Sequence, residues 1–450
     1  MLQGQLLLEN RQKIQIPNDM KHRHLQLLFS LHSQKSTASP WLSYPQQLQQ
    51  VVHDIQKSTA EWLFSQVLVD RHSLERYLYS FRQMFLLGHG DLAVNLIEEC
   101  SHWRRRSILR SGDKRSSSGQ SSDRESTRSS SHKSASTIFR HQELNALLVK
   151  ASVGTDAEDT LHGYSLRILD DSQETGFADL LLMDAQCWLT YEMRWPIDLF
   201  LSEADLARYG ELWCFLIGLR SVQMSLSGLW QYLRGGKESD RSEQWIHKGN
   251  HGNDEEGFEE RLIWRLRSRM IFWVDALWSH MQANVINTHY ENLIDMVSPC
   301  SEQSKKRRSV SKPATLDFEE IQVAHDDYLG NITRGCLLTS SRCSEAMNHT
   351  LRTCVDFCEL VKQLSEDEEW LFRKRRKTTK TASEIVRQWT QPSTLAQNPW
   401  IHRICELEEI FNSSTELFFE LITHQSQEVK SSGNLDLLLM QLDYNNWYSK

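Results

Sequence analysis

The sequence contains little glycine and proline, with 19 Gly and 8 Pro among 450 residues. In an average globular protein these two residues make up roughly 12% of the chain, about twice the share found here. Turns between strands draw on the positive φ of glycine and the fixed φ of proline. A chain this long with so few of them is therefore not a sandwich, a barrel or a propeller, and the composition predicts a helical protein.

Long apolar runs and a surplus of basic residues are also missing. No continuous apolar run reaches the length of a membrane-spanning helix, about 18 residues, and Met1–Asn10 shows neither the basic leader nor the cleavage site of a signal peptide. The formal charge is −8, whereas nucleic-acid binding needs a clustered basic face. We therefore expect a cytosolic or nuclear protein that binds neither nucleic acid nor membranes, with its nine cysteines reduced.

Apolar residues recur at three- and four-residue spacing over most of the chain, which is typical of helices with one buried face. Ser202 followed by Asp205 predicts a capping box at the start of one of these helices. The 15 Trp indicate that wide, flat side chains fill the space between helices. The five clearest stripes run over Leu74–Phe85, Leu206–Leu216, Leu266–Met281, Ile321–Ile332 and Ile401–Phe411.

Two short segments alternate apolar and polar residues instead, which predicts two strands in a small hairpin. The second strand is expected to end at Pro196, because proline lacks a backbone donor. The predicted fold class is all-α, with elongated helical bundles, a small embedded β-hairpin and disordered polar inserts. The alternating residues are Tyr164, Leu166 and Ile168 in the first strand, and Leu189, Tyr191, Met193 and Trp195 in the second.

Four polar stretches separate the periodic segments. In residues 115–136, 11 of 22 residues are Ser, and such a composition cannot offset its ordering entropy. We therefore predict a disordered insert over 111–137. The other inserts lie near 235–257, 298–313 and 366–399. The predicted domains are 1–110, the end of an N-terminal helical region with the start of a middle bundle, and 138–450, a C-terminal helical domain.

Sequence motifs of enzymes and cofactor sites are absent or incomplete. The phosphate-loop, G-x-S-x-G and H-E-x-x-H patterns do not occur. Residues 88–93 fit G-x-G-x-x-A, yet a dinucleotide site needs a strand before this pattern, and a helical stripe precedes it here. We favour a helix–turn–helix junction over a dinucleotide loop, with Gly88 as the C-terminal cap of the first helix. We expect no enzymatic activity and no cofactor.

Four cysteines lie close together in the sequence without the C-x₂-C element of a structural zinc site. Cys354 and Cys358 share one face of an apolar-periodic helix, which favours packing over metal binding. The other two are Cys336 and Cys343. We therefore predict no metal site and place the function in a binding surface.

Taken in order, the periodic segments resemble the gamma-tubulin complex component family. The blocks that carry the resemblance are Val51–Ile55 with Phe85–Leu92, Tyr191–Ile197 with Leu206–Trp213, Arg265–Val274, Asp317–Leu329 and Leu437–Tyr448. They cover most of residues 48–448. The short length and the ending Leu442–Asn445 are most similar to component four, while components two, three, five and six stay open.

The resemblance implies an all-helical protein whose C-terminal half binds gamma-tubulin and whose N-terminal half contacts other gamma-tubulin complex components. The resemblance also implies that these components assemble laterally into a ring, which supports microtubule nucleation at the microtubule-organising centre or spindle pole. The resemblance starts just before the gamma-tubulin-binding half, so we expect most of the lateral-contact region to be missing.

We predict that gamma-tubulin contacts polar and aromatic residues near two of these blocks. The candidate contact residues are Asp317, Glu320, His325, Tyr328, Asp443, Tyr444, Trp447 and Tyr448. For Tyr328 and Trp447 a place in the helical core is the alternative. The rival interpretation of the whole chain is a generic cytosolic helical scaffold or a subunit of a tethering complex, which predicts no association with gamma-tubulin.

Overall fold

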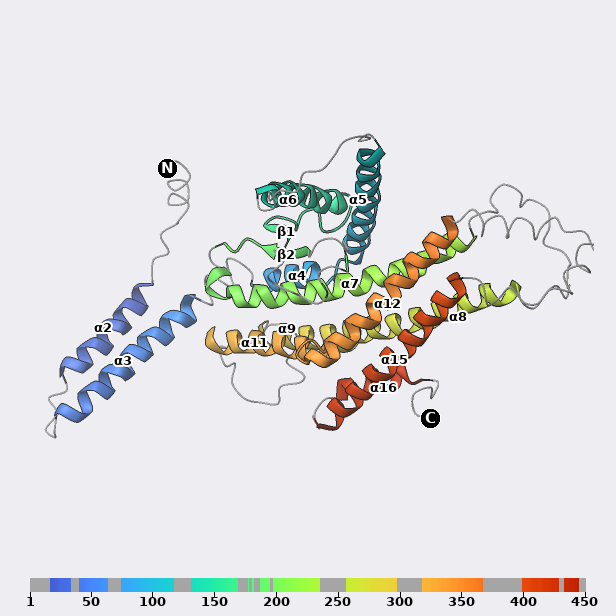
Figure 1. Ribbon diagram of the computed structural model, residues 1–450. Helices are drawn as coiled ribbons and strands as arrows, with labels where there is room; N and C mark the ends of the chain where they lie inside the picture. The colour runs from blue at the N-terminus through green and yellow to red at the C-terminus, as the bar shows by residue number, and fades with distance from the viewer. Residues whose placement is uncertain are drawn as a thin grey trace, which may run out of the picture. The chain divides into compact units, whose positions relative to one another are not determined.

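The computed structural model describes most of the chain, with gaps between several helices. The described residues are 17–33, 40–63, 74–116, 131–168, 177, 180–181, 187–194, 197–234, 256–297, 318–366, 399–428 and 433–444. They form long helices and a two-stranded sheet (Figure 1), which confirms the predicted all-α class with a small β element. Large parts of the four predicted inserts fall outside the described residues.

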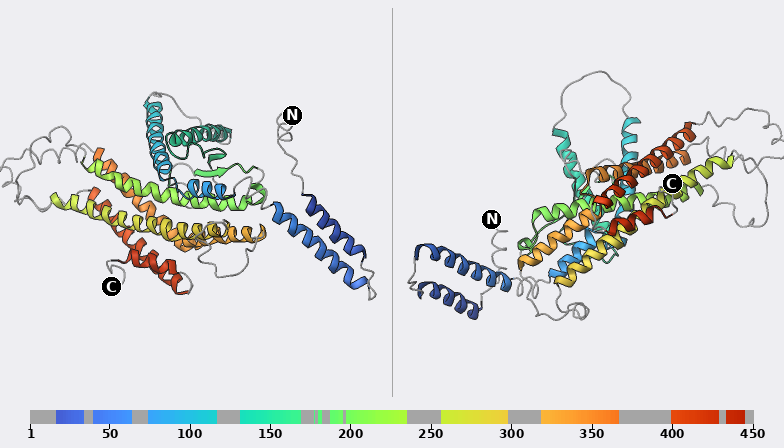
Figure 2. Two further views of the ribbon diagram at one scale, coloured as in Figure 1. Left: turned by 180° about the vertical axis from the view of Figure 1, so that it is seen from behind. Right: turned by 90° about the horizontal axis from the view of Figure 1, so that it is seen from below.

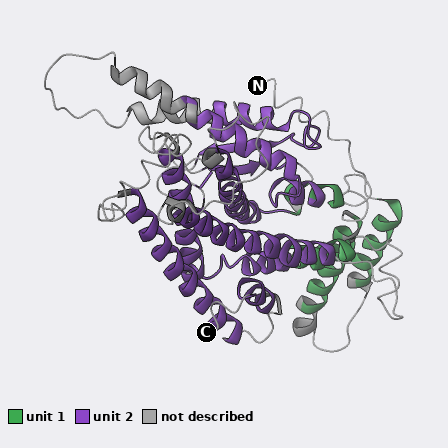
Figure 3. Cartoon of the chain, turned by 90° about the vertical axis from the view of Figure 1, so that its right-hand side faces the viewer, with its two compact units in different colours: residues 1–77, 195–200, 294–325 green, residues 78–194, 201–293, 326–450 purple. Residues whose placement is uncertain are grey.

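The chain divides into two compact units (Figure 3). One unit contains residues 1–77, 195–200 and 294–325, and its two long helices are α2 (Asn18–Ser33) and α3 (Pro40–Leu63), which pack against each other. The other unit contains residues 78–194, 201–293 and 326–450 and holds most of the buried core.

A layered arrangement surrounds the sheet of the larger unit. Helix α5 (Gly90–Ser116) packs on α6 (Ser131–Ser152), α6 packs on strand β1 (Tyr164–Ile168), and strand β2 (Cys187–Tyr191) packs on α7 (Glu203–Arg234). The two strands are antiparallel, with Leu166 opposite Leu189. Both of these leucines are buried, so the alternation predicted from the sequence points one face of the sheet into the core.

Long helices form the rest of the larger unit. Helix α7 contacts α5, α8 (Glu256–Ser279) and α12 (Ser341–Glu366), and α12 packs along α15 (Pro399–Glu428). The views in Figure 2 show these long helices side by side. Helix α8 continues through a π-helical segment, η3 (His280–Asn287), into α9 (Thr288–Val297). The other elements in the described part of the chain are α4 (Leu74–Met84), a short 3₁₀ helix η2 (Ile197–Leu199), α11 (Phe318–Gly335) and α16 (Gly433–Leu442). Of these, η2 belongs to the smaller unit, and α4 and α11 have residues in both units.

The predicted stripes form the buried faces of these helices. All five residues of the stripe Leu266–Met281 are at most 3% exposed, and they are Leu266, Met270, Trp273, Leu277 and Met281. The capping box at the start of α7 is confirmed: the Ser202 amide donates to Asp205 Oδ2 at 2.9 Å, and the Asp205 amide donates to Ser202 Oγ at 3.2 Å.

Helix α7 is the most apolar of the long helices. By length and composition, its segment Glu203–Gln231 could cross a membrane, with a mean hydropathy of 1.3. A central core helix meets the same criterion, and 67% of the most apolar stretch of α7 is buried against its neighbours. The helix therefore has a structural reason for its composition, because it packs on α5, α8, α12 and β2.

An aromatic cluster joins α4, the sheet and α7. The Phe81 ring lies 5.1 Å from Tyr191, 5.5 Å from Tyr209 and 5.8 Å from Phe85, measured between ring centroids. Tyr164 joins from β1, and its hydroxyl lies 2.8 Å from Ser80 Oγ. The Phe81–Phe85 and Phe81–Tyr191 pairs are edge-to-face and the Phe81–Tyr209 pair is tilted, and such aromatic contacts add to the stabilisation that comes from burial alone.

Two predicted boundaries are wrong. Strand β2 ends at Tyr191, so Met193 lies outside it and Pro196 does not end the ladder; Trp195 and Pro196 are outside the described residues. The partner strand β1 begins at Tyr164, opposite Tyr191, and beyond that pair only the Glu192 amide among the described residues continues the pairing, donating to the Gly163 carbonyl at 2.8 Å. Helix α5 also extends to Ser116 and α6 begins at Ser131, inside the predicted Ser-rich insert. Both helices extend into the predicted insert because, once a helix has nucleated, each further residue that joins it gains a backbone hydrogen bond for the entropy that it loses.

Candidate binding surface

The G-x-G-x-x-A motif lies between two helices, as predicted. Helix α4 precedes it and α5 begins at Gly90, so no strand leads into the motif. The predicted cap is wrong in one detail, because the residue with positive φ is Leu87, at 56°, and not Gly88. At Gly88 a Cβ would lie 2.9 Å from Gln83 Cδ, so a larger residue there would require the Gln83 side chain to shift. The amides of Gly88 and His89 donate to the carbonyls of Arg82 and Gln83 and close the helix end.

The cysteines singled out in the sequence lie in the helical core. Cys336, Cys343, Cys354 and Cys358 are each at most 2% exposed. Burial raises the pKa of the Cys336 and Cys358 thiols to about 12, which disfavours the thiolate that a metal would require. Among the residues that the structure describes, no group of three or more His, Cys, Asp or Glu could hold a metal ion.

Helix α16 has apolar side chains on two faces. Its residues Leu435, Leu438 and Leu442 are at most 4% exposed, and the helix packs on α15, α8 and η3. Leu437 and Met440, at 45% and 70% exposure, point away from that core. A helix that is apolar all round is normally buried on all sides. The exposed face of α16 is therefore a candidate site for contact with another macromolecule.

The same face continues past the end of the helix. Tyr444 follows α16 and is 80% exposed, and it lies four residues after Met440, one helical turn further along. The Asp443 amide donates to the Leu439 carbonyl at 2.9 Å, which holds the chain in a helical turn up to that point. We define the α16 face as Leu437, Met440 and Tyr444. A large tyrosine beside a methionine is a composition favoured in binding surfaces.

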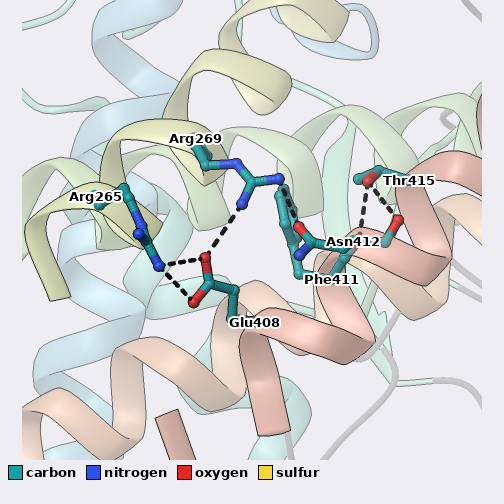
Figure 4. A network of polar contacts seen from close by, with 6 residues as sticks. All are labelled: Arg265, Arg269, Glu408, Phe411, Asn412 and Thr415. Carbon is teal, nitrogen blue, oxygen red and sulfur yellow. Dashed lines mark hydrogen bonds and ion pairs between the residues drawn. The ribbon is translucent and has the colours of Figure 1, made fainter. Parts of the chain in front are cut away.

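A polar network fixes two of the helices on which α16 rests (Figure 4). Glu408 on α15 accepts from Arg265 at 2.9 and 3.0 Å and from Arg269 at 3.3 Å, both on α8. Arg269 also donates to Asn412, one turn further along α15. The Glu408 and Arg269 side chains are 15% and 24% exposed, so this ion pair is better shielded from water than an ordinary surface pair, whereas Arg265 is 59% exposed. The network thus fixes α8 relative to α15, and α16 packs on both of these helices.

Apolar packing continues beside this network. The Trp273 ring on α8 lies 6.5 Å from Phe411 and 5.4 Å from Phe418, both on α15, in edge-to-face geometry. The buried Thr415 hydroxyl donates a hydrogen bond to the Phe411 carbonyl at 2.9 Å (Figure 4). Helices α8 and α15 are thus joined by both polar and aromatic contacts, which gives α16 a rigid support.

The structure separates the predicted contact residues by accessibility. Glu320 on α11 is exposed, whereas His325 and Tyr328 on the same helix are only 2% and 5% exposed. The expectation of a surface position does not hold for these two. The His325 ring packs 5.2 Å from the Phe200 ring, and burial raises the pKa of Tyr328. Tyr328 takes the core position that the sequence analysis kept as its alternative.

At the C-terminal block, Tyr444 is exposed and Asp443 is half-buried. Asp317, Trp447 and Tyr448 lie outside the described residues. Sequence reasoning missed Leu437 and Met440 as surface residues. The available signal was the run of four apolar residues Leu437–Met440, because such a run cannot be buried on one helix face alone.

Among the residues that the structure describes, the fold is helical with a small β element and leaves one apolar helix face exposed, an arrangement that favours contact with another macromolecule. Residues 74–448 match the family model described as "Gamma tubulin complex component C-terminal". The chain therefore belongs to the gamma-tubulin complex component family, and the resemblance seen in the sequence is confirmed.

Curated relatives agree with this membership. Human gamma-tubulin complex component 4 is 24% identical over 412 residues, which is 89% of this chain and 50% of the relative. The fission yeast spindle pole body component alp4 is 25% identical over 169 residues, which is 38% of this chain and 19% of the relative. Gamma-tubulin complex component 2 of Arabidopsis thaliana is 20% identical over 355 residues, 79% of this chain and 43% of the relative. The chain matches at most about half the length of these relatives.

Proposed function

We propose that this chain is a non-enzymatic component of the gamma-tubulin complex and that it binds gamma-tubulin. The observation that carries the proposal is the family match over residues 74–448, which includes every long helix of the larger unit. In this role gamma-tubulin keeps its own nucleotide, and the chain supplies a shaped surface without a cofactor. Its further partners are other gamma-tubulin complex components, and its place is the cytoplasm, at the microtubule-organising centre or spindle pole.

We assign the contact to the predicted C-terminal domain, residues 138–450, and centre it on the α16 face. Tyr444 supports this choice because it is both a predicted contact residue and 80% exposed. Leu437 and Met440 extend the apolar area beside it, and Asp443 lies at its edge. Aromatic and methionine side chains that leave water on binding commonly contribute most to the affinity of an interface.

Helix α11 carries separate predicted contact residues, which we keep as a proposal of their own. Glu320 is its exposed member, and His325 and Tyr328 support the helix from inside without reaching gamma-tubulin. Asp317, Trp447 and Tyr448 remain predicted contacts in parts of the chain outside the described residues.

The experiment compares gamma-tubulin binding by the full chain with binding by its Tyr444→Lys variant. Removing the ring and adding a charge should weaken binding about tenfold or more, because the lysine ammonium would have to be desolvated. Tyr79→Lys is the matched control, since Tyr79 is a 48% exposed tyrosine on α4. Binding by biolayer interferometry should fall for Tyr444→Lys alone. Equal affinity for all three proteins would remove the α16 face from the proposal, and no binding by any of them would contradict the function.

A further inference from the structure

Helices α5 and α6 form a basic pair in a chain whose formal charge is −8. The sequence of α5 contains six Lys or Arg and four Asp or Glu, and that of α6 contains three Lys or Arg and one Glu. The two helices together therefore carry a formal charge of +4. Charge of one sign that is concentrated on one part of a molecule attracts partners of the opposite sign and speeds their association.

Polar contacts join the two helices along one seam. Lys150 on α6 donates to Glu99 on α5 at 2.6 Å, and the Trp103 indole on α5 donates to Glu143 on α6 at 3.1 Å. Successive contacts run forward along α5 and backward along α6, so the helices are antiparallel where they meet. The positions of their side chains relative to the seam can therefore be compared.

A depression of about 320 Å³ opens at this seam, and it is lined by Glu99, His102, Arg106 and Lys150. The hydrogen bond from Lys150 lowers the pKa of Glu99, and the charges of Lys150, His102 and Arg106 act in the same direction. One carboxylate thus already lies among three basic groups. Arg106 is exposed and makes no ion pair with any described residue, so its guanidinium can receive a second carboxylate from outside.

Apolar side chains border the depression on α6. Val149 and Val153 are 55% and 64% exposed and lie four residues apart. At about 100° per residue, both are offset from Lys150 in the same sense around the helix. On α5, His102 and Arg106 are offset from the seam in that sense too, and in antiparallel helices equal offsets lie on the same side of the seam. We call these five residues the α5–α6 face.

We propose that the α5–α6 face binds an acidic segment of a partner protein, one in which apolar side chains lie beside the carboxylates. Arg106 pairs with one carboxylate through two parallel N–H groups, a geometry that the guanidinium favours. Lys150 keeps two further N–H donors beyond its bond to Glu99 and binds a second carboxylate. Val149 and Val153 cover the apolar side chains of the segment, which removes both sets from water.

A nucleic acid fits this face less well than an acidic peptide. Phosphates would approach the carboxylate of Glu99 inside the depression, and the two valines have no apolar counterpart in a phosphate backbone. Binding to single strands also uses aromatic rings on which bases stack. Trp103, the aromatic residue at the seam, is half-buried and bonded to Glu143, so it offers little ring surface.

The α5–α6 face is distinct from the α16 face. Helices α5 and α6 pack on each other, on β1 and on α7, whereas α16 packs on α15, α8 and η3. The inference therefore goes beyond the proposed binding of gamma-tubulin, and Arg106→Glu should leave that binding unchanged.

Fluorescence anisotropy of a labelled synthetic peptide with the full chain tests the proposal. The peptide carries Glu and Leu at helical spacing, and in a comparison peptide Gln replaces every Glu. We expect the Glu peptide to bind at least about tenfold more tightly than the Gln peptide, with an affinity that falls as salt is added. Arg106→Glu and Val149→Asp should each weaken binding of the Glu peptide about tenfold or more, because each adds a like charge to the face.

Two matched controls change the same residue types elsewhere. Arg342→Glu alters an exposed arginine at the start of α12, and Val323→Asp alters a 60% exposed valine on α11. Both should bind the Glu peptide as the wild type does. Circular dichroism establishes that each variant keeps its helical content. Tyr444→Lys should also bind the peptide normally, so failure of the gamma-tubulin proposal leaves this test intact.

Three results would overturn the proposal. Equal affinity for the two peptides, or no binding of either at millimolar concentration, would show that the face does not recognise carboxylates. Equal loss of binding in the control variants would place the contact elsewhere. Tighter binding of a single-stranded RNA than of the Glu peptide, lost in Arg106→Glu, would assign the face to nucleic acid instead.

Discussion

His280 is a fully buried histidine at the start of the π-helical segment η3. Its Nδ1 lies 3.3 Å from the side-chain amide of Asn284, and its Nε2 has no hydrogen-bond partner among the described residues. Burial lowers its pKa from 6.5 to about 4, so the ring is neutral in the folded protein at physiological pH. Protonation would place an unpaired charge in the core.

This burial predicts a pH dependence of stability. The unfolded chain takes up the proton near pH 6.5 and the folded chain only near pH 4, so the free energy of unfolding falls as the pH drops between these values. The loss attributable to His280 is about 3 kcal/mol when complete. Urea unfolding of the wild type and of His280→Gln measures it as a difference between the two pH profiles. If the free energies of unfolding of the wild type and of His280→Gln changed with pH in the same way, His280 would not contribute to the pH dependence.

Leu87 and Gly88 show what residue patterns can and cannot specify. The sequence predicted a junction at this place and assigned the cap to glycine, the residue that most easily adopts positive φ. In the structure a leucine takes the positive φ, and its side chain is only 7% exposed, so burial of the leucine offsets the backbone cost. Such a compensation depends on the tertiary core, which a local pattern does not contain.

At the scale of elements, two of the three glycines in α7 have contrasting surroundings. A Cβ at Gly210 would overlap the indole of Trp188 on β2, whereas a Cβ at Gly228 would meet nothing within 4 Å. Gly210 thus allows the sheet to approach the helix closely. Gly228 has no such role in the described contacts.

We predict that alanine has opposite effects at these two positions. Gly228→Ala should stabilise the protein by up to about 1 kcal/mol, because alanine has the higher helix propensity. Gly210→Ala should destabilise it by about 1–3 kcal/mol, because the new methyl group displaces Trp188. The urea midpoints of the two variants relative to the wild type measure both effects. A stabilising Gly210→Ala would mean that the sheet is free to move away from α7.

The π-helical segment shows where element prediction from sequence stops. The stripe Leu266–Met281 predicted a buried helix face correctly, since periodicity reports directly on burial. The change to π geometry at His280 left no mark in that periodicity. A π segment is held by contacts that belong to the fold. Here they include the Gln282 side-chain amide, which donates to the Leu86 carbonyl at 3.1 Å, and Val285, which packs against Gly335.

At the scale of the whole molecule, the sequence predicted the fold class and the family better than the contact surface. The class follows from composition and periodicity, which are sums over many residues and tolerate local errors. The contact residues depend on which side of each helix faces solvent at single positions. Tyr444 and Tyr328 show the difference: both were chosen as tyrosines in blocks resembling the family, and one is 80% exposed while the other is 5% exposed.

The central claim is that this chain forms a specific complex with gamma-tubulin, and sedimentation velocity of the purified full chain mixed with gamma-tubulin tests it most directly. We predict a new, faster boundary that contains both proteins and that persists at physiological ionic strength, because the proposed α16 face is apolar and salt screens only its charged rim. Two boundaries that sediment independently, even at low salt and with gamma-tubulin in excess, would contradict the account.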